Sequence, residues 1–204
     1  MSGLARRTWG IACILLLAGC AGTGRPPEPA AARDWAQRQA QLAALTYWTA
    51  SGKIALRTAR EAESASLRWE QSGNDTHLEL SGPLGVAATT VDSDGQYLAI
   101  RRGEEYRRWS LTDPQLGQAN HWDLPLASLH YWLKGIAAPD APVQELALDP
   151  ATQLPQTLQQ QGWTVEYQGF GRFGDYQLPT RLQVQRDSTR ARILLRDWRL
   201  RDKP

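Results

Sequence analysis

Residues 66–81 read Ser-Leu-Arg-Trp-Glu-Gln-Ser-Gly-Asn-Asp-Thr-His-Leu-Glu-Leu-Ser, and this stretch decides the fold class. Leu67 and Trp69 alternate with charged residues before its centre, and Leu78 and Leu80 do so after it. A period of two is typical of strands that bury one face. The Gly-Asn pair between the two runs is typical of a tight hairpin, so the two strands are predicted to be antiparallel neighbours.

The same period of two begins near Tyr47 and recurs along the chain. Short, evenly spaced strands separated by turn residues predict a mainly β fold, a meander that curls into a barrel or part of one, rather than a parallel sheet. The glycines at 169, 171 and 174 are interpreted as turn residues in a loop between strands. Further strands are predicted at 86–91, 96–101, 105–111, 143–148, 163–167, 180–186 and 191–198.

Two segments show helical spacing instead. The first begins at Asp34, after which Trp35, Leu42 and Leu45 fall on one apolar face. The second follows Leu124-Pro125-Leu126, places Leu129, Trp132, Leu133 and Ile136 on one side, and ends at Gly135 and Pro139. A further helical stretch is predicted to open at Asp113-Pro114. A helix inserted between strands of a curled sheet can cover its open mouth as a lid.

The N-terminus has the three parts of an export signal: Arg6 and Arg7, an apolar run, and small residues before Cys20. Leu-Ala-Gly-Cys at 17–20 resembles a lipobox, the signal for acylation of the cysteine and cleavage before it. Ordinary secretory cleavage near Ala18, leaving a free thiol, is the alternative. The predicted organisation is a signal peptide at 1–19, a lipidated cysteine and linker at 20–33, and one domain at 34–204.

Charge and cysteine content exclude several classes. Removal of residues 1–19 takes Arg6 and Arg7 from the 23 basic side chains and none of the 21 acidic ones, so the mature chain has no formal charge excess. It therefore lacks the basic stripe that nucleic-acid binding requires. Cys13 leaves with the signal and Cys20 is predicted to be acylated, so no disulfide is expected in the exported domain.

We find little in the sequence that points to catalysis. Three histidines, His77, His121 and His130, lack neighbours at metal-ligand spacing, so no metal or cofactor is predicted. The carboxylate pairs Glu61 with Glu63 and Glu104 with Glu105 lie in charged hairpins and are a weak basis for a paired acid and base. The chain is therefore predicted not to be an enzyme.

Tryptophan is abundant: eight of the nine residues remain after cleavage, beside two phenylalanines. Large indoles on the inner face of a curved sheet make wide apolar walls that suit flexible hydrocarbon, although an ordinary packed core is the alternative. In Ser81-Gly82-Pro83-Leu84-Gly85, glycine and proline on both sides of one leucine predict a turn. That turn either exposes Leu84 for membrane contact or folds it back over the core.

Several of these segments together resemble the LolB family: the lipobox, Pro-Leu-Gly at 83–85, the segment from 124 to 135, residues 163–167, and Leu-Arg-Asp-Trp at 195–198. The resemblance implies an open, strongly curved antiparallel half-barrel of about 10–11 strands with a helical lid over an apolar cavity, as in LolA and LolB proteins. Residues 86–88 are uniformly small and apolar, which departs from the family's alternation.

The resemblance also implies a function. Such a protein receives acylated lipoproteins from the periplasmic carrier LolA and inserts them into the inner leaflet of the outer membrane, where it is itself anchored facing the periplasm, as a monomer. The alternative is a lipid-anchored envelope adaptor that binds a protein partner and has no lipid cavity. The residues expected to serve as the membrane-insertion loop are Pro83, Leu84 and Gly85, and those expected to line the acyl-chain cavity are Trp48, Trp69, Leu78, Leu80, Trp132, Leu133, Ile136, Trp163 and Val165.

Overall fold

The computed structural model describes residues 30–82, 88–113 and 124–201, which form one antiparallel sheet and two helices. The sheet has 11 strands in the order β6-β5-β4-β3-β2-β1-β11-β10-β9-β8-β7. The helices are α1 (Ala30–Ala43) and α3 (Leu126–Leu133). The strands are β1 (Tyr47–Arg57), β2 (Ala62–Ser72), β3 (Asp75–Ser81), β4 (Thr89–Ser93), β5 (Tyr97–Arg102), β6 (Glu105–Ser110), β7 (Val143–Leu148), β8 (Pro155–Gln160), β9 (Trp163–Phe173), β10 (Tyr176–Arg186) and β11 (Thr189–Leu200).

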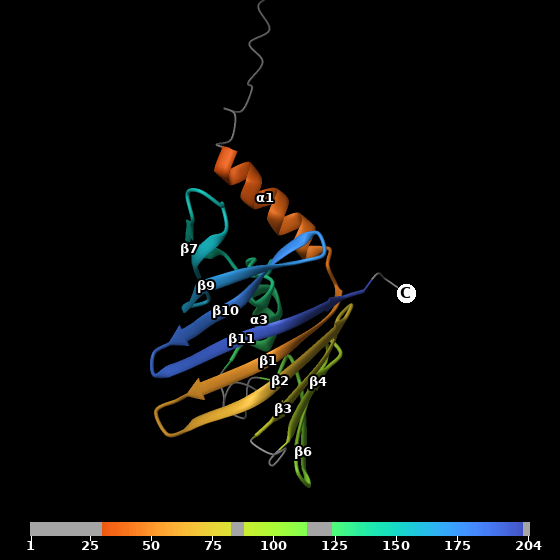
Figure 1. The fold of residues 1–204 in the computed structure, drawn as a ribbon. Coiled ribbons are helices and arrows are strands. Elements are labelled where there is room, and N and C mark those ends of the chain that lie inside the picture. The colour runs from red at the N-terminus through yellow and green to blue at the C-terminus, as the bar shows by residue number, and fades with distance from the viewer. Residues whose placement is uncertain (1–29, 83–87, 114–123, 202–204) are drawn as a thin grey trace, which may run out of the picture.

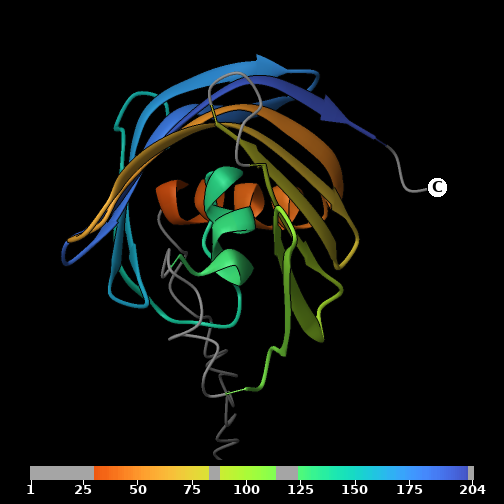
Figure 2. The same cartoon turned by 90° about the horizontal axis from the view of Figure 1, so that it is seen from below.

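The sheet is a meander whose two halves join in the middle. Every pair of neighbouring strands is consecutive in sequence except β1 and β11, the first and last strands. The two edge strands are therefore β6 and β7, and the segment between them carries α3. The sheet arches over both helices, which lie inside its concave face (Figures 1 and 2). This confirms the predicted fold class, an open, curved antiparallel sheet with a helix beneath it.

The hairpin that decided the fold class is present, and its strands are antiparallel neighbours as predicted. Trp69 pairs with Leu78 and Leu67 with Leu80, so their side chains share the inner face. Gly73 adopts a φ of 63° at the turn, a conformation that glycine reaches without steric cost. The alternation of apolar and charged residues therefore correctly predicted strands β2 and β3 and the face that each buries.

Gly52 lies in β1 directly against the backbone of the neighbouring strand β11. The register shifts between Ser51 and Gly52, which marks a β-bulge. A Cβ built at Gly52 would overlap the carbonyl oxygen of Leu194, so only glycine fits. Because bulges increase local twist and bend a strand, this site contributes to the curvature that gives the sheet a concave face.

Two strand predictions need correction. β8 was missed because it begins with proline and carries polar Gln156, Gln159 and Gln160, a pattern with weak alternation. Gly169 and Gly171 were wrongly assigned to a loop, since both lie inside β9. A Cβ at either would come within 3.0 Å of the Thr180 side chain, beside a register shift in β10, so close approach of the strands requires glycine there. Gly174, with a φ of 58°, is the actual turn residue.

The helices agree with the sequence apart from their ends. α1 begins at Ala30 rather than Asp34, so the last four residues of the predicted linker are helical. Three of these are alanine, the residue with the highest intrinsic helix propensity. The helical stretch predicted from Pro114 lies in residues 114–123, outside the described part. Neither α1 nor α3 has the length and apolar character that a membrane-crossing helix needs.

Candidate functional site: a cavity between helix α3 and the sheet

Two groups of tryptophans fill the core. Trp48 contacts Trp69 with ring centroids 6.1 Å apart and Trp198 with centroids 5.1 Å apart. Trp132 of α3 packs against Trp163 of β9 with ring centroids 6.5 Å apart, and this pair joins the helix to the sheet. Offset and tilted aromatic pairs of this kind add stabilisation beyond the area that they bury.

All nine residues predicted to line an acyl-chain cavity lie in this buried core. They are at most 7% exposed, and six of them, including Trp48, Trp69 and Trp132, are fully covered. None of the nine lines the cavity described next. A role for them in lipid contact stays a prediction. Cys20 and the loop residues Pro83, Leu84 and Gly85 lie outside the described residues.

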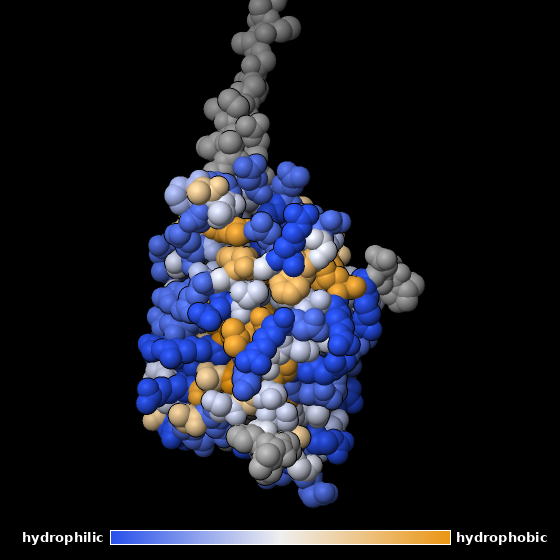
Figure 3. Space-filling model, in the orientation of Figure 1, coloured by the Kyte–Doolittle hydropathy of each residue, from blue (hydrophilic) through white to orange (hydrophobic). Residues whose placement is uncertain are grey.

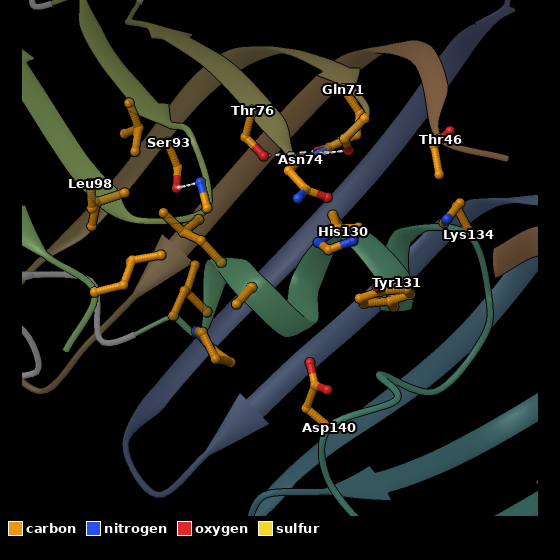
Figure 4. A pocket seen from close by; sticks show the side chains of 18 of the residues that line it. Thr46, Gln71, Asn74, Thr76, Ser93, Leu98, His130, Tyr131, Lys134 and Asp140 are labelled. Carbon is orange, nitrogen blue, oxygen red and sulfur yellow. Dashed lines mark hydrogen bonds between the residues drawn. The ribbon is translucent and has the colours of Figure 1, made fainter. Parts of the chain in front are cut away.

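A cavity of about 560 Å³ lies between α3 and the ends of strands β2 to β5. Figure 4 shows Leu98 at one end and Gln71 and Lys134 toward the other, with α3 running alongside. The end nearer β4 and β5 is apolar and is lined by Val91, Leu98, Leu111, Leu124 and Leu126. The other end is polar and is lined by the β2–β3 turn and the C-terminal part of α3, including Gln71, Asn74, Thr76, His130, Tyr131 and Lys134.

His130, at the polar end, is unprotonated at neutral pH. Burial, reinforced by the nearby Lys134 ammonium, lowers the pKa of His130 to about 4. The centroid of its ring lies 3.9 Å from that of Tyr131, and the imidazole is neutral near pH 7. The side-chain oxygen of Gln71 is already hydrogen-bonded within the protein: Oε1 accepts from Trp69 Nε1 at 3.1 Å and from Thr76 Oγ1 at 2.8 Å. Neither of these two residues therefore adds charge to the polar end, whose charged lining residues are Lys134, Asp140 and Arg186.

Lys134 follows directly after α3 and is 1% exposed. Its Nζ donates to the carbonyl oxygens of Leu42 at 2.8 Å and Leu45 at 3.0 Å, at the C-terminal end of α1. Burial lowers its pKa to about 8, because the charged form loses hydration that two carbonyls only partly replace. Lys134 thus joins the two helices through a costly buried cation.

Gln160 of β8 holds the other side of the lid helix. Its Oε1 accepts from Trp132 Nε1 and from the Ala138 amide, both at 2.9 Å. Its Nε2 donates to the carbonyl oxygens of Ala138 and Ala141, both at 2.7 Å. All four hydrogen-bonding positions of this fully buried amide are therefore used to fix α3 and the segment after it.

Helix α1 adds further bonds to the segment that follows α3. Arg38 donates to the carbonyl oxygens of Lys134, Gly135 and Gln177 at 2.9–3.4 Å. Gln39 and Ala137 exchange two hydrogen bonds at 2.6 and 3.0 Å. The C-terminal end of α3 is therefore tied to α1, β8 and β10.

The side of α3 that faces the cavity is held differently. Within residues 30–82, 88–113 and 124–201, no hydrogen bond joins α3 to strands β2 to β5. Its polar bonds run to Gln161, Gln160 and Tyr167 instead. Pro125 precedes the helix and supplies no side-chain cap. Helix α3 is thus hydrogen-bonded along one edge, and its other edge borders the cavity opposite Val91 and Leu98.

The remaining candidate residues from the sequence do not form a reactive site. His77 lies on the outer face, with Nδ1 2.6 Å from Asp92 and Nε2 3.3 Å from Glu79, and the hydrogen bond to Asp92 raises its pKa. Glu63 pairs with Arg102 at 3.4 Å. Among the described residues no group of histidine, cysteine and carboxylate side chains could hold a metal ion. His121 lies outside these residues.

Sequence reasoning missed most of the residues that line the cavity. Gln71, Thr76 and Asn74 stand in or beside a turn, where polar residues are ordinary, and only their position opposite α3 makes them part of a wall. Val91 and Leu98 lay in predicted strands and carried the expected inward period. Lys134 could have been noticed as the single lysine in an otherwise apolar segment.

Comparison with known proteins agrees with this geometry. Residues 46–198 match the sequence model of the family described as outer membrane lipoprotein LolB. The chain belongs to the LolB family. It is 36% identical to the outer-membrane lipoprotein LolB of Alkalilimnicola ehrlichii over 190 residues, covering 91% of this chain and 92% of that one. With LolB of Stutzerimonas stutzeri it shares 33% identity, over 92% of both chains.

Solved structures support the fold of this LolB-family chain. A LolA superfamily protein from Nitrosomonas europaea matches with a TM-score of 0.54 and 13% identity, over 85% of this chain and 94% of that one. At that identity the likeness concerns the fold alone. The family predicted from the lipobox, the 83–85 turn and the 124–135 segment is therefore confirmed, as is the outer-membrane lipoprotein class.

The buried lysine makes a pH dependence measurable. Because folding lowers the pKa of Lys134 from 10.5 to about 8, the unfolded chain binds more protons between these values, and the free energy of unfolding rises with pH in this window. The free energy of unfolding of the wild type, measured by urea denaturation, should increase relative to that of Lys134→Met by about 1–2 kcal/mol from pH 7.5 to 9.5. No such increase is expected relative to the exposed Lys53→Met. A constant difference for Lys134→Met would contradict burial of a charged ammonium.

Proposed function

We propose that this chain is an outer-membrane lipoprotein receptor that accepts acylated lipoproteins from a LolA-type periplasmic carrier and inserts them into the inner leaflet of the outer membrane. It acts as a monomer, anchored by its own lipid and facing the periplasm. The observation that carries this proposal is the cavity under α3, whose apolar end is closed by a helix fixed along one side only. Membership of the LolB family supports a trafficking function rather than an enzymatic one.

The energetics of the cargo require a shelter of this kind. Three acyl chains carry about 45 methylenes, each worth about 0.8 kcal/mol on leaving water, so free transit would cost about 36 kcal/mol. No spontaneous step of that size occurs on a useful timescale, and the chains must pass directly from one apolar site to the next. A chain of acceptors without ATP then needs each site to hold the cargo at least as well as the one before.

The cavity must enlarge to take this cargo. A volume of about 560 Å³ lies within the range of ordinary small-molecule sites. Because the side-chain hydrogen bonds of α3 within the described residues run to the β8–β10 side, the helix can move away from β3, β4 and β5 without breaking them, and hydrocarbon can fill the widened space. Trp132 and Leu133 lie on α3 itself, so we propose that they and the other predicted core residues join the cavity wall when the helix moves.

Substitution at the cavity mouth tests the shelter. Ala127 is exposed on α3 and lines the cavity, so Ala127→Trp fills space that hydrocarbon would occupy. We expect binding of a fluorescent fatty acid, followed by titration, to weaken by about 1–3 kcal/mol. Ala36→Trp on the exposed side of α1 adds the same indole away from the cavity and should leave binding unchanged. Failure of the wild type to bind fatty acid would favour the adaptor function and refute the shelter.

Lipidation of Cys20 is the proposed means of attachment. Cys20→Ser removes the acylated thiol, and the chain is expected to shift from the membrane to the soluble periplasmic fraction, because the acyl chains supply the membrane affinity. Intact mass measurement of the membrane-bound protein checks the modification directly. Cys13→Ser, inside the signal, serves as the matched control and should stay membrane-bound with unchanged mass. An unmodified thiol at Cys20 would support ordinary secretory cleavage.

The turn at 83–85 is proposed to act at delivery. Leu84→Glu places a carboxylate where an apolar side chain would enter the bilayer, and charges of this kind cost about 2.5–3.5 kcal/mol at membrane depth. We expect acyl binding to persist while transfer of bound lipoprotein into liposomes slows at least about ten-fold. Val143→Glu, an exposed apolar position on edge strand β7, is the matched charge control. Normal transfer by Leu84→Glu would remove the loop from the mechanism.

A further inference from the structure

The outer face of the sheet contains a second hollow, separate from the cavity under α3. Its volume is about 570 Å³, and it crosses β10, β11, β1, β2 and β3 on the side away from the helices. Apolar and hydrophilic side chains intermingle on this face in Figure 3. We call this hollow the outer groove, and its outward-facing lining consists of Lys53, Ala55, Ser64, Ser66, Ser81, Gln168, Arg181, Arg192 and Leu194.

Strand register places the key residues in one transverse row. Arg181 and Lys53 both pair with Leu194, from β10 and β1 on either side of β11. Lys53 pairs in turn with Ser66, and Ser66 with Ser81. Since neighbouring strands lie about 4.8 Å apart, the two cations flank one leucine with their backbones about 10 Å apart, and two hydroxyls continue the row. The groove thus presents cations, hydroxyls and an apolar side chain side by side.

The positive charge of the groove is not neutralised by its surroundings. Lys53 and Arg181 form no ion pair or hydrogen bond with any side chain in the described ranges, and no carboxylate is among the lining residues found there. Arg192 donates to Gln183 Oε1 at 3.1 Å, and the same amide donates to Glu166 at 3.2 Å, so that carboxylate is held one residue away. The adjoining residues 83–87 read Pro-Leu-Gly-Val-Ala and contain no acid.

The opposite end of the same face is acidic. Around the β2–β3 and β4–β5 turns, a second outer hollow is lined by Glu70, Asp75, Asp92 and Asp94, with His77 and Arg108 as its basic members. The cations toward Gly82 therefore have no carboxylate among their described lining neighbours, whereas toward Gly73 and Gly95 acids outnumber the basic lining residues and are partly ion-paired, Glu70 with Arg201 and Asp94 with Arg108. Near an anionic surface, a distribution of this kind turns the first end toward the surface and the second away from it.

We propose that the outer groove binds the phosphate-bearing headgroups of an anionic phospholipid membrane. Lys53, Arg181 and Arg192 supply the positive field, Ser66 and Ser81 donate hydrogen bonds to phosphate oxygens, and Leu194 contacts the interface. Binding there orients the end of the sheet that bears Gly82 toward the lipid. This proposal does not depend on whether the cavity under α3 takes acyl chains, because it concerns the opposite face of the sheet.

The test uses the mature chain with Cys20→Ala, so that its own lipid does not fix it to vesicles. Binding is measured by flotation with vesicles of phosphatidylcholine alone and of phosphatidylcholine with phosphatidylglycerol, at low and high salt. Each basic residue at an anionic surface is worth about a five-fold factor in binding, so Lys53→Gln with Arg181→Gln should weaken binding to anionic vesicles about 25-fold. Arg108→Gln with Arg201→Gln removes the same charge at the acidic end, where Arg108 lines the hollow and Arg201 pairs with Glu70, and should weaken binding less than about two-fold.

The outcomes separate the alternatives. Preference for anionic vesicles that is lost with salt and lost in the groove variant, but kept in the control, supports the proposal. Equal loss of vesicle binding in both variants would show a diffuse charge effect and overturn the groove as the binding site. Equal binding of the wild type to both vesicle types would overturn it as well. Inorganic phosphate is the competitor: displacement beyond that of chloride at equal ionic strength assigns the groove to free phosphate and overturns membrane docking. Thermal unfolding confirms that both variants fold.

Discussion

The fixed side of α3 depends on one buried amide. Gln160 uses both lone pairs of its oxygen and both N–H groups, and its four bonds reach an indole on α3 and backbone groups of the segment that follows. A fully satisfied amide in a dry core is strong and directional, whereas removal of it would leave four buried groups without partners. The position of the helix relative to β8 is therefore specified much more sharply than apolar packing alone could specify it.

The contrast between the two sides of α3 gives the cavity its character. Hydrogen bonds on the β8–β10 side require particular geometry and are lost if the helix moves as a whole. Apolar burial on the β3–β5 side is non-directional and scales with buried area. In the proposed function, an acyl chain would therefore enter on this side, where α3 borders the cavity opposite Val91 and Leu98 and has no hydrogen bond to the described strands. The cavity already lies along that side.

Much of this fold could be read from the sequence, and the exceptions share one cause. Alternation predicted β2 and β3 because their buried and exposed residues differ strongly in polarity, and it failed for β8 because Gln160 is polar yet fully buried. Gly169 and Gly171 mimic turn residues, but their absence of a Cβ serves close packing against Thr180. In both cases the residue type is explained by a tertiary partner that a local window does not contain.

The candidate site shows the same limit. An abundance of tryptophan correctly predicted large apolar surfaces, yet Trp48, Trp69 and Trp163 lie in the packed core and not around the cavity. Composition cannot distinguish an indole that fills space from one that borders it, because both positions reward the same burial. The cavity depends instead on where α3 stops contacting the sheet, and that is determined by residues 90 or more positions apart in sequence, such as Lys134 with Leu42.

The two faces of the sheet have complementary physical demands. In the proposed function the concave face releases hydrocarbon into a bilayer, which requires contacts of large total area and little directionality, as apolar walls provide. The proposed role of the convex face requires the reverse, a weak attraction that orients one end of the molecule toward lipid. A lipid-anchored chain already has a high local concentration at the membrane, so a few unpaired cations suffice for orientation. Directionality of delivery can then arise without an energy source, because the acceptor bilayer buries the acyl chains more completely than any half-open cavity does.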